Sequence, residues 1–580
     1  MQVVKKRILI WFMVFTLAAS AAFALIYRTT IRYYLSELIH NHHIVSNKLL
    51  ARENEEVSGI FYKKNAKGYD RSLKFNHLVL QVNNNSSFRI NKNILNAAHE
   101  KNNILLTVEF WGNLFYNKYS IKNEPLKEII DGSLDAKLQK IYNTLLDSDR
   151  EIFVRINPEM ELWVYNTPWE NRDNYIEAYR HVVSFWQKKN PNLKFIWGPA
   201  GFNGCERYYP GDDVVDLISI TLQSEAEKMY TRYPAYGSLE NEIHRKLHRL
   251  RFFNKPVMII TSDKMFDKTE VANAVNDEID SIAKYQDIAY DETLWNNAQL
   301  SIPNEEFQIG VYDPRKLLLT DSSITTEHLF LDFGHLQSRD SKTYLDDVFS
   351  RNHDVILTFE PWIDYGRITD PNVLANIVDG KYDTLIHLLY NDISNSNHTV
   401  YLRFAHEMEI PITRYAWQSK DPIIYIKAFR YFMQFPNPFP LNVKKVWGPA
   451  GDRGAPDYYP GDDVVDYVSF AAYGLPDKNI TDFNKQIMFS TIFEDKIINY
   501  RYMNKPVFIT EFGVKGPNEY KLKWMEDAAI TLNKNPQVVG VNYFNMSDTP
   551  GAWGDIKEPD WSIDTSILHR FLEVLKKDNQ

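Results

Sequence analysis

The sequence contains a single cysteine, Cys205, so no disulfide can form within the chain. It also has no excess of positive charge, since 66 Lys and Arg residues stand against 75 Asp and Glu residues and give a net charge of −9. Binding to nucleic acid requires a basic face, so a nucleic-acid partner is not expected. The patterns of a P-loop, a dinucleotide-binding turn and a CxxC pair are absent as well, which leaves no motif for a nucleotide cofactor.

The sequence does contain a block that occurs twice. Residues 197–216 read WGPAGFNGCERYYPGDDVVD, and residues 447–466 read WGPAGDRGAPDYYPGDDVVD. Four further pairs of segments match in the same order: 104–111 with 355–362, 129–132 with 377–380, 153–162 with 401–410, and 254–261 with 504–511. The offset stays between 248 and 251 residues, and about 250 residues is the usual length of one (β/α)8 barrel. We therefore predict a duplicated domain, with a first copy over 56–303 and a second copy over 304–580.

The N-terminal end differs from both copies. Lys5, Lys6 and Arg7 precede residues 8–27, a run of 20 residues without a charge that is long enough to cross a bilayer as a helix. The basic flank is expected to stay in the cytoplasm, which places both copies on the outer side of the cell membrane. Two interpretations stay open: an uncleaved, single-pass signal anchor over 1–28, which the length of the run favours, or a cleavable signal peptide. Residues 29–55 are predicted to form a stalk.

The second copy alternates short β-rich runs with longer amphipathic stretches. Eight strands are expected, at 308–312, 328–333, 354–360, 399–405, 444–450, 465–473, 506–512 and 538–544. Alternation of eight strands with helices predicts a (β/α)8 barrel. In the first copy, the first strand is expected at 59–63, and the eighth is hard to place, with 298–302 as a guess. The predicted fold class is therefore α/β, with two tandem (β/α)8 barrels after a transmembrane helix.

Two glutamates end predicted strands of the second copy. Glu407 ends the fourth strand and Glu511 ends the seventh. The carboxyl ends of all barrel strands meet at one mouth, so the two carboxylates are expected to face each other across it. Retaining glycoside hydrolysis uses such a pair, because one carboxylic acid protonates the leaving oxygen while one carboxylate attacks the anomeric carbon. Arg403, in the fourth strand, is a candidate to keep a nearby carboxylate ionised.

The motifs around these glutamates resemble glycoside hydrolase family 26, a family of retaining (β/α)8 enzymes that includes β-mannanases. The resemblance rests on RFAHEME (403–409), WGPAG (447–451), YYPGDDVVD (458–466) and PVFITEFG (506–513). It covers 305–580, and more weakly 55–262. The resemblance implies that Glu407 is the acid/base and that Glu511 is the nucleophile.

The resemblance also implies roles for residues around the pair. His406 would bind the substrate, Tyr473 would hold the nucleophile by a hydrogen bond, and Trp553 would form an aromatic floor under the sugar. The other residues expected to line the substrate site are Arg403, Trp362 and Trp417. Glu409 and Ile410 depart from the family's pattern beside the acid/base, so the sugar is left open.

Structural interpretations compete with these roles. Glu511 could be a salt-bridged carboxylate, His406 a core histidine and Trp553 a loop anchor. The three aspartates of PGDDVVD suggest a metal cluster, but the first copy keeps all three although it has lost the nucleophile. We therefore expect them to be structural: Asp462, Asp463, Asp466 and their equivalents Asp212, Asp213, Asp216.

The first copy keeps only part of the catalytic set. Its sequence matches the second copy as follows: Arg155 with Arg403, Glu159 with Glu407, Pro158 with His406, Gln223 with Tyr473, and Thr261 with Glu511. Threonine cannot form the glycosyl ester of a retaining mechanism. The first copy is therefore expected to be a non-catalytic partner. Two alternatives are an inverting pair of Glu159 with Asp263, and a remnant sugar cleft lined by Trp111, Trp163 and Trp169.

Together these observations predict a membrane-anchored, exported, retaining endo-β-glycosidase that resembles a mannanase and acts on a β-linked polysaccharide. The chemistry requires no metal or organic cofactor. The anchor over 8–27 suggests exopolysaccharide processing, with synthesis machinery of that polysaccharide as a partner. The alternatives are a non-catalytic glycan-binding or assembly protein of an export system, and a transglycosylase that uses the same two glutamates.

Overall fold

The computed structural model divides into two units, Met1–Ala283 and Lys284–Gln580. It describes residues 49–51, 55–62, 68–82, 102–110, 125–145, 150–162, 171–190, 193–222, 238–261, 268–284, 306–363, 370–412, 414–476, 485–549 and 557–577. The predicted anchor over 8–27 and most of the stalk lie outside these residues. Within them, no helix is both long and apolar enough to cross a membrane. The predicted domain boundary at 303/304 also falls outside the described residues.

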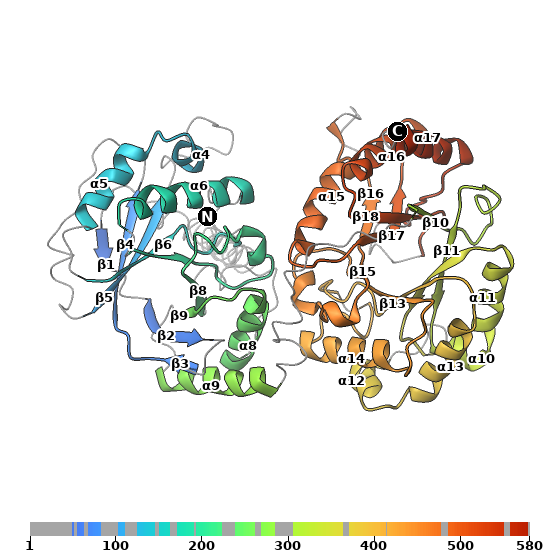
Figure 1. Ribbon diagram of the computed structural model, residues 1–580, viewed down its shortest axis with the longest axis horizontal. Helices are drawn as coiled ribbons and strands as arrows, with labels where there is room; N and C mark the ends of the chain where they lie inside the picture. Colours follow the sequence, from blue (N-terminus) through green and yellow to red (C-terminus); the bar gives the residue numbers. More distant parts are fainter. Residues whose placement is uncertain are drawn as a thin grey trace, which may run out of the picture. The chain divides into compact units, whose positions relative to one another are not determined.

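The second unit is built from β-strands that alternate with helices (Figure 1). The strands are β10 (Gln308–Tyr312), β11 (Thr326–Leu331), β12 (Asp354–Phe359), β13 (Val400–Phe404), β14 (Val443–Trp447), β15 (Tyr467–Val468), β16 (Ala471–Gly474), β17 (Val507–Val514) and β18 (Val538–Phe544). The α-helices are α10 (Phe333–Ser338), α11 (Asp340–Ser350), α12 (Val373–Val378), α13 (Asp383–Ser394), α14 (Pro422–Gln434), α15 (Phe489–Ile497), α16 (Asn518–Asn533) and α17 (Thr565–Lys577).

The strands of the second unit close on themselves. Every pairing in this sheet is parallel, and β10 pairs with both β11 and β18. β15 and β16 are two segments of one sixth strand, and both pair with β17. The result is an eight-stranded parallel barrel, as the sequence predicts for this copy. The expected single strand at 465–473 is broken after Val468. Most of the other strands begin and end within two residues of the predicted positions.

Six strands of the barrel each contribute one side chain to a buried apolar cluster. This buried cluster consists of Ile356, Tyr401, Val446, Tyr467, Phe508 and Val539. The first unit has a buried cluster in which five members stand at the offsets of the sequence repeat: Leu105, Phe153, Ile196, Leu217 and Met258. Burying such side chains stabilises a fold by about 1.5–3 kcal/mol each. Both units therefore carry a floor of apolar side chains beneath the carboxyl ends of their strands.

The first unit has a different sheet. Its strands are β1 (Leu49–Ala51), β2 (Glu56–Tyr62), β3 (Gly68–Asp70), β4 (Phe75–Val82), β5 (Asn103–Phe110), β6 (Ile152–Ile156), β7 (Lys194–Trp197), β8 (Leu217–Leu222) and β9 (Val257–Thr261). Its α-helices are α4 (Pro125–Ile130), α5 (Asp135–Leu145), α6 (Arg172–Gln187), α8 (Leu239–Arg249) and α9 (Lys268–Lys284). β4 to β9 are parallel and adjacent in order, which matches strands two to seven of a barrel.

The two remaining barrel positions of the first unit correct the prediction. β1 runs antiparallel to β4, and β2 runs antiparallel to β9. The segment 59–63, expected as a first parallel strand, therefore belongs largely to a reversed strand at the place of strand eight. Among the described residues no strand pair joins the two ends of this sheet, β1 and β3. A β-rich run in the sequence indicates a strand but does not give its direction, which explains the error. The guess at 298–302 lies outside the described residues.

Candidate active site

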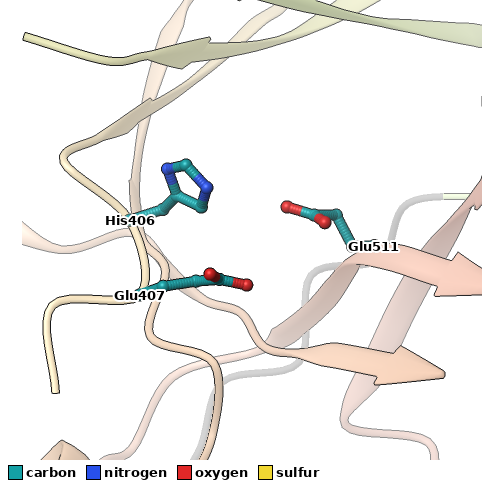
Figure 2. Close-up of side chains that lie close together, drawn as sticks. All are labelled: His406, Glu407 and Glu511. Carbon is teal, nitrogen blue, oxygen red and sulfur yellow. The ribbon is translucent and has the colours of Figure 1, made fainter. Parts of the chain in front are cut away.

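The mouth of the second barrel brings three predicted residues together. His406 and Glu407 follow β13, and Glu511 lies in β17 on the opposite side (Figure 2). One ring nitrogen of His406 and one carboxylate oxygen from each glutamate all lie within 4.8 Å of one another. Residues separated by more than a hundred positions in the sequence thus form one site, as the strand order predicts.

The Glu511 carboxylate is fixed by two hydrogen bonds. Arg403 Nη2 donates to Oε1 at 2.5 Å, and the Tyr473 hydroxyl donates to Oε2 at 2.7 Å. Tyr473 comes from β16, whose Ala471 pairs directly with Glu511 in the sheet. The two donors occupy one oxygen each and so fix the orientation of the carboxylate. The structure therefore confirms the predicted contact of Tyr473 with Glu511 and provides an oriented carboxylate.

Arg403 contacts the Glu511 carboxylate from a buried position. Its side chain is buried, and its other donors bond the hydroxyls of Thr358 at 2.8 Å and Thr510 at 2.8 Å. A side chain on Gly448 would overlap the Arg403 side chain, so the glycine of WGPAG makes room for it. Arg403 was expected to line the substrate site. Its burial corrects this expectation, because the guanidinium is 1% exposed and bonds Glu511 and the two threonines.

Glu407 has the features of a proton donor. Burial, and then the nearby Glu511 charge, raise the pKa of its carboxyl to about 8, although Arg403 opposes the shift. Its backbone adopts φ 54°, a conformation that is uncommon outside glycine, and its N–H donates to the Gly448 carbonyl at 3.0 Å. Strained backbone of this kind is often found at active sites. The two glutamates therefore occupy different environments, and Glu407 holds its proton at neutral pH.

His406 stands against an aromatic wall. Its ring lies 5.3 Å from the ring of Tyr415 and 6.2 Å from that of Phe330, and its carbonyl accepts a hydrogen bond from Trp417 Nε1 at 2.7 Å. Burial, followed by the charge of Arg403, holds the pKa of His406 well below its usual range. The imidazole is therefore neutral. It lies beside both glutamates, and its substrate-binding role stays a prediction.

The three tryptophans that were predicted to line the substrate site differ in their surroundings. Trp417 is fully buried and stacks on Tyr415 at 4.6 Å. It supports the wall behind His406, so the prediction that it contacts the substrate is wrong. Trp362 is partly exposed and packs edge-on against Tyr415 at 5.3 Å, which leaves it as a candidate for sugar contact. Trp553 lies outside the described residues.

Sequence reasoning missed Glu360, a third carboxyl at the mouth. It follows β12, and its Oε1 lies 3.9 Å from His406 Nε2. Burial raises its pKa to about 7; Arg414 lowers it, and the charge of Glu511 raises it further. The signal was present, because Glu360 ends a predicted strand in the same way as Glu407. Its equivalent Glu109 is kept in the first copy, so comparison of the two copies does not single it out.

Glu409 has a structural explanation for its departure from the family pattern. Its carboxylate accepts the backbone N–H groups of Gly451 at 2.9 Å, Asp452 at 3.0 Å and Ala450 at 3.3 Å. In the first unit, Glu161 accepts the N–H groups of Gly201 at 2.9 Å and Phe202 at 3.0 Å. Glu409 therefore fastens the loop after β14 and does not face the sugar site.

The aspartates of PGDDVVD are structural in both units, as predicted. Asp463 binds Arg430 through both oxygens at 2.7 Å, and Asp466 accepts the N–H of Lys445 at 2.8 Å. Asp462 accepts the hydroxyl of Tyr459 at 2.6 Å. The first unit repeats these contacts through Asp213 with Arg180, Asp216 with Phe195, and Asp212 with Tyr209.

The first unit keeps a glutamate at the position of Glu407 but has a different residue at the position of Glu511. Glu159 has φ 58°, and its N–H donates to the Gly198 carbonyl at 2.7 Å. Thr261 is buried where the second unit has Glu511. Arg155 instead lies 3.7 Å from a carboxylate oxygen of Glu55, which precedes the reversed strand β2. The predicted residues Trp111, Trp163, Trp169, Gln223 and Asp263 lie outside the described residues.

Parts of the chain are similar in sequence to known proteins. No protein-family model matches the chain. It is 25% identical over 236 residues to Endoglucanase H of Acetivibrio thermocellus and 27% identical over 195 residues to the β-1,3-xylanase TXYA of a Vibrio species. These matches cover 39% and 32% of this chain, and they span 24% and 36% of the two relatives. The solved structure of GH26C from Muricauda sp. is 15% identical over 41% of this chain and 79% of that chain, with a TM-score of 0.32. The curated relatives are thus glycoside hydrolases, and the chain spans about a quarter to a third of their length.

Proposed function

We propose that the second unit is a retaining β-glycosidase in which Glu407 is the acid/base and Glu511 is the nucleophile. The observation that carries the proposal is the approach of the two carboxylates, whose oxygens lie within 4.8 Å of each other. Retaining enzymes hold this pair about 5–5.5 Å apart, whereas inverting enzymes leave about 6.5–9.5 Å for a water molecule. The spacing therefore favours direct attack by a carboxylate.

The different surroundings of Glu407 and Glu511 indicate which of them is the acid/base and which is the nucleophile. In the first step, the Glu511 carboxylate attacks the anomeric carbon while Glu407 gives its proton to the glycosidic oxygen, so that this bond breaks and a glycosyl ester forms. In the second step, the Glu407 carboxylate takes a proton from water, and the resulting hydroxyl group joins the anomeric carbon as the ester to Glu511 breaks. Arg403 and Tyr473 stabilise Glu511 as it regains its full charge.

The substrate we propose is a β-linked polysaccharide that is cut internally. The names of the curated relatives support this class, since one is an endoglucanase and one is a β-1,3-xylanase. The resemblance of RFAHEME and PVFITEFG to mannanases keeps β-mannan among the candidates. If a second sugar replaces water in the second step, the same two glutamates perform transglycosylation.

The remaining parts of the proposal concern the whole chain. The first unit is a non-catalytic partner, because Thr261 replaces the nucleophile and Pro158 replaces the histidine. Residues 8–27 anchor the chain in the cell membrane with both units outside, and this location suggests processing of the cell's own exopolysaccharide. The support for the anchor is the uncharged run and its basic flank.

The test uses residues 28–580 with β-mannan, β-glucan, β-xylan and the host's exopolysaccharide. We expect release of reducing ends that E511A and E407A abolish, and that E159A, the matching change in the first unit, leaves unchanged. Proton NMR of the first product should show retained configuration at the anomeric carbon. Binding to one of these glycans without any release would instead indicate a glycan-binding or assembly protein.

A further inference from the structure

The catalytic residues form a set of metal-ligand atoms. His406, Glu407 and Glu511 each offer one ligand atom, and these atoms lie within 4.8 Å of one another. One histidine nitrogen with two carboxylate oxygens is a donor set that suits Zn²⁺ and similar transition metals more than Mg²⁺ or Ca²⁺, which prefer oxygen alone. We propose that these three side chains bind a divalent transition-metal ion such as Zn²⁺, and that this ion competes with the glycan.

His406 is the residue that points to a ligand. It is 3% exposed, its Nδ1 has no hydrogen-bond partner among the described residues, and its Nε2 has only a Glu360 oxygen at 3.9 Å, which is beyond hydrogen-bond distance. A buried polar group without a partner is costly unless something binds it. One ring nitrogen is turned toward Glu511 (Figure 2). An ion or a sugar hydroxyl in the space between them would satisfy this nitrogen.

Two of the three ligands are already held in place. Glu511 is fixed by Arg403 and Tyr473, and each of its oxygens keeps a second lone pair for another partner. The His406 ring is held by the aromatic wall of Tyr415 and Trp417. Preorganised ligands lower the entropic cost of binding.

Glu407, the third ligand, has to move for the three atoms to coordinate one ion. Ligand atoms around a tetrahedral Zn²⁺ ion, with bonds of about 2.0–2.1 Å, stand roughly 3.3 Å apart, so the largest separation of up to 4.8 Å has to shorten by about 1.5 Å. Glu407 is partly exposed, and within the described part of the chain no hydrogen bond fixes its carboxyl. Rotation of this side chain can therefore close the site.

A further carboxyl oxygen lies beside the site. Glu360 places a carboxylate oxygen 3.9 Å from His406 Nε2, so three carboxyls converge on the same space. Arg403 opposes a cation, but it is paired with Glu511, and Arg414 is exposed. An ion bound here would occupy both the proton donor and the nucleophile, so metal and glycan would exclude each other.

The experiment measures metal binding without using activity. Co²⁺ is added to metal-free residues 28–580, and the visible absorption of the ion is recorded; Zn²⁺ affinity is measured by calorimetry. We expect one tight site per chain, with Zn²⁺ displacing Co²⁺. H406Q should weaken Zn²⁺ binding at least tenfold, whereas H387Q, which removes an exposed histidine of α13, should leave it unchanged.

Two further comparisons keep the proposal testable. E407Q removes a ligand from a partly exposed position, so it should weaken Zn²⁺ binding even if H406Q does not fold. In the unchanged protein, the apparent Zn²⁺ affinity should fall when an oligosaccharide that the protein cleaves or binds is added. Equal Zn²⁺ binding by H406Q, E407Q and the unchanged chain would overturn the proposal, as would the absence of saturable binding. Neither result would bear on the glycosidase proposal, which the release of reducing ends tests separately.

Discussion

Glu407 differs from ordinary surface glutamates because it is poorly solvated and lies beside a second carboxylate. Its pKa is raised to about 8, so the carboxyl is protonated below that pH and loses its proton as the pH rises through it. The first step requires the protonated form. We therefore expect kcat/KM to fall above about pH 8. Aryl glycosides with a good leaving group need no acid catalyst, so E407A can be assayed on them. We expect the decrease of kcat/KM above pH 8 to disappear in E407A. A decrease that persists in E407A would show that another group causes it.

Tyr473 donates one hydrogen bond to Glu511, the proposed nucleophile, and Y473F removes that bond with little change in shape. A hydrogen bond to a charged group contributes about 1.5–3 kcal/mol, which corresponds to a decrease of roughly 10- to 100-fold in kcat. The control is Y431F, because Tyr431 donates to Asp383 on the outer helices at 2.7 Å. Steady-state kinetics with both variants checks the prediction, and an equal loss in Y431F would contradict it.

Glu360 shows how a strand-end residue can be overlooked. The motif VILTFEPW places it at a strand end, and the structure places its carboxyl beside His406. The same letter occurs in the first copy, where Glu109 accepts a hydrogen bond from Gln81 at 3.1 Å. Comparison of the two copies detects only residues that differ between them, and this glutamate is present in both. Only the surroundings of Glu360 in the folded second unit distinguish it from Glu109.

The loop after β14 depends on a carboxylate from the segment after β13. Glu409 accepts three backbone N–H groups in the second unit, and Glu161 accepts two in the first. Each unsatisfied buried N–H costs about 1–3 kcal/mol. We expect E409A to lower the free energy of unfolding of the second unit by about that amount or more, and E161A to act similarly on the first. Chemical denaturation checks this against E494A, an exposed glutamate of α15; equal stabilities would contradict the structural role.

The reversed strand β2 changes the chemistry of the first unit. Glu56 pairs with Thr261 in register, which brings the preceding Glu55 to the end of β9 where the second unit has its nucleophile. Glu55 then lies 3.7 Å from Arg155, which is 1% exposed. A buried arginine without a counter-charge is costly, so this carboxylate explains how Arg155 is balanced although Thr261 stands at the position of Glu511.

The contact of Glu55 with Arg155 predicts a stability difference. E55Q should destabilise the first unit by about 2 kcal/mol, since it removes a charge that faces a buried charge. E56Q, one position along, changes an exposed side chain and should have little effect. Hydrogen exchange of peptides from β6 and β9 checks this within the full chain. Unchanged protection in E55Q would show that other groups balance Arg155.

At the level of the whole molecule, the N-terminal run predicts where the protein resides. An apolar helix of 20 residues without a charge partitions into a bilayer. We expect the full chain to stay with membranes after carbonate extraction, whereas residues 28–580 are released. Recovery of a mature N-terminus beyond residue 27 would indicate a cleaved signal peptide and remove the argument for an anchored role in exopolysaccharide processing.

The sequence by itself determined the two-fold repeat, the eight strands of the second copy and the pair Glu407 and Glu511, because these depend on local patterns and on comparison within the chain. It also indicated that the PGDDVVD aspartates are structural. The tertiary structure decided what local patterns do not encode: the direction of β2, the burial of Arg403 and Trp417, and the approach of Glu360 to His406. Strand direction and side-chain burial follow from contacts between distant segments, and such contacts exist only once the chain has folded.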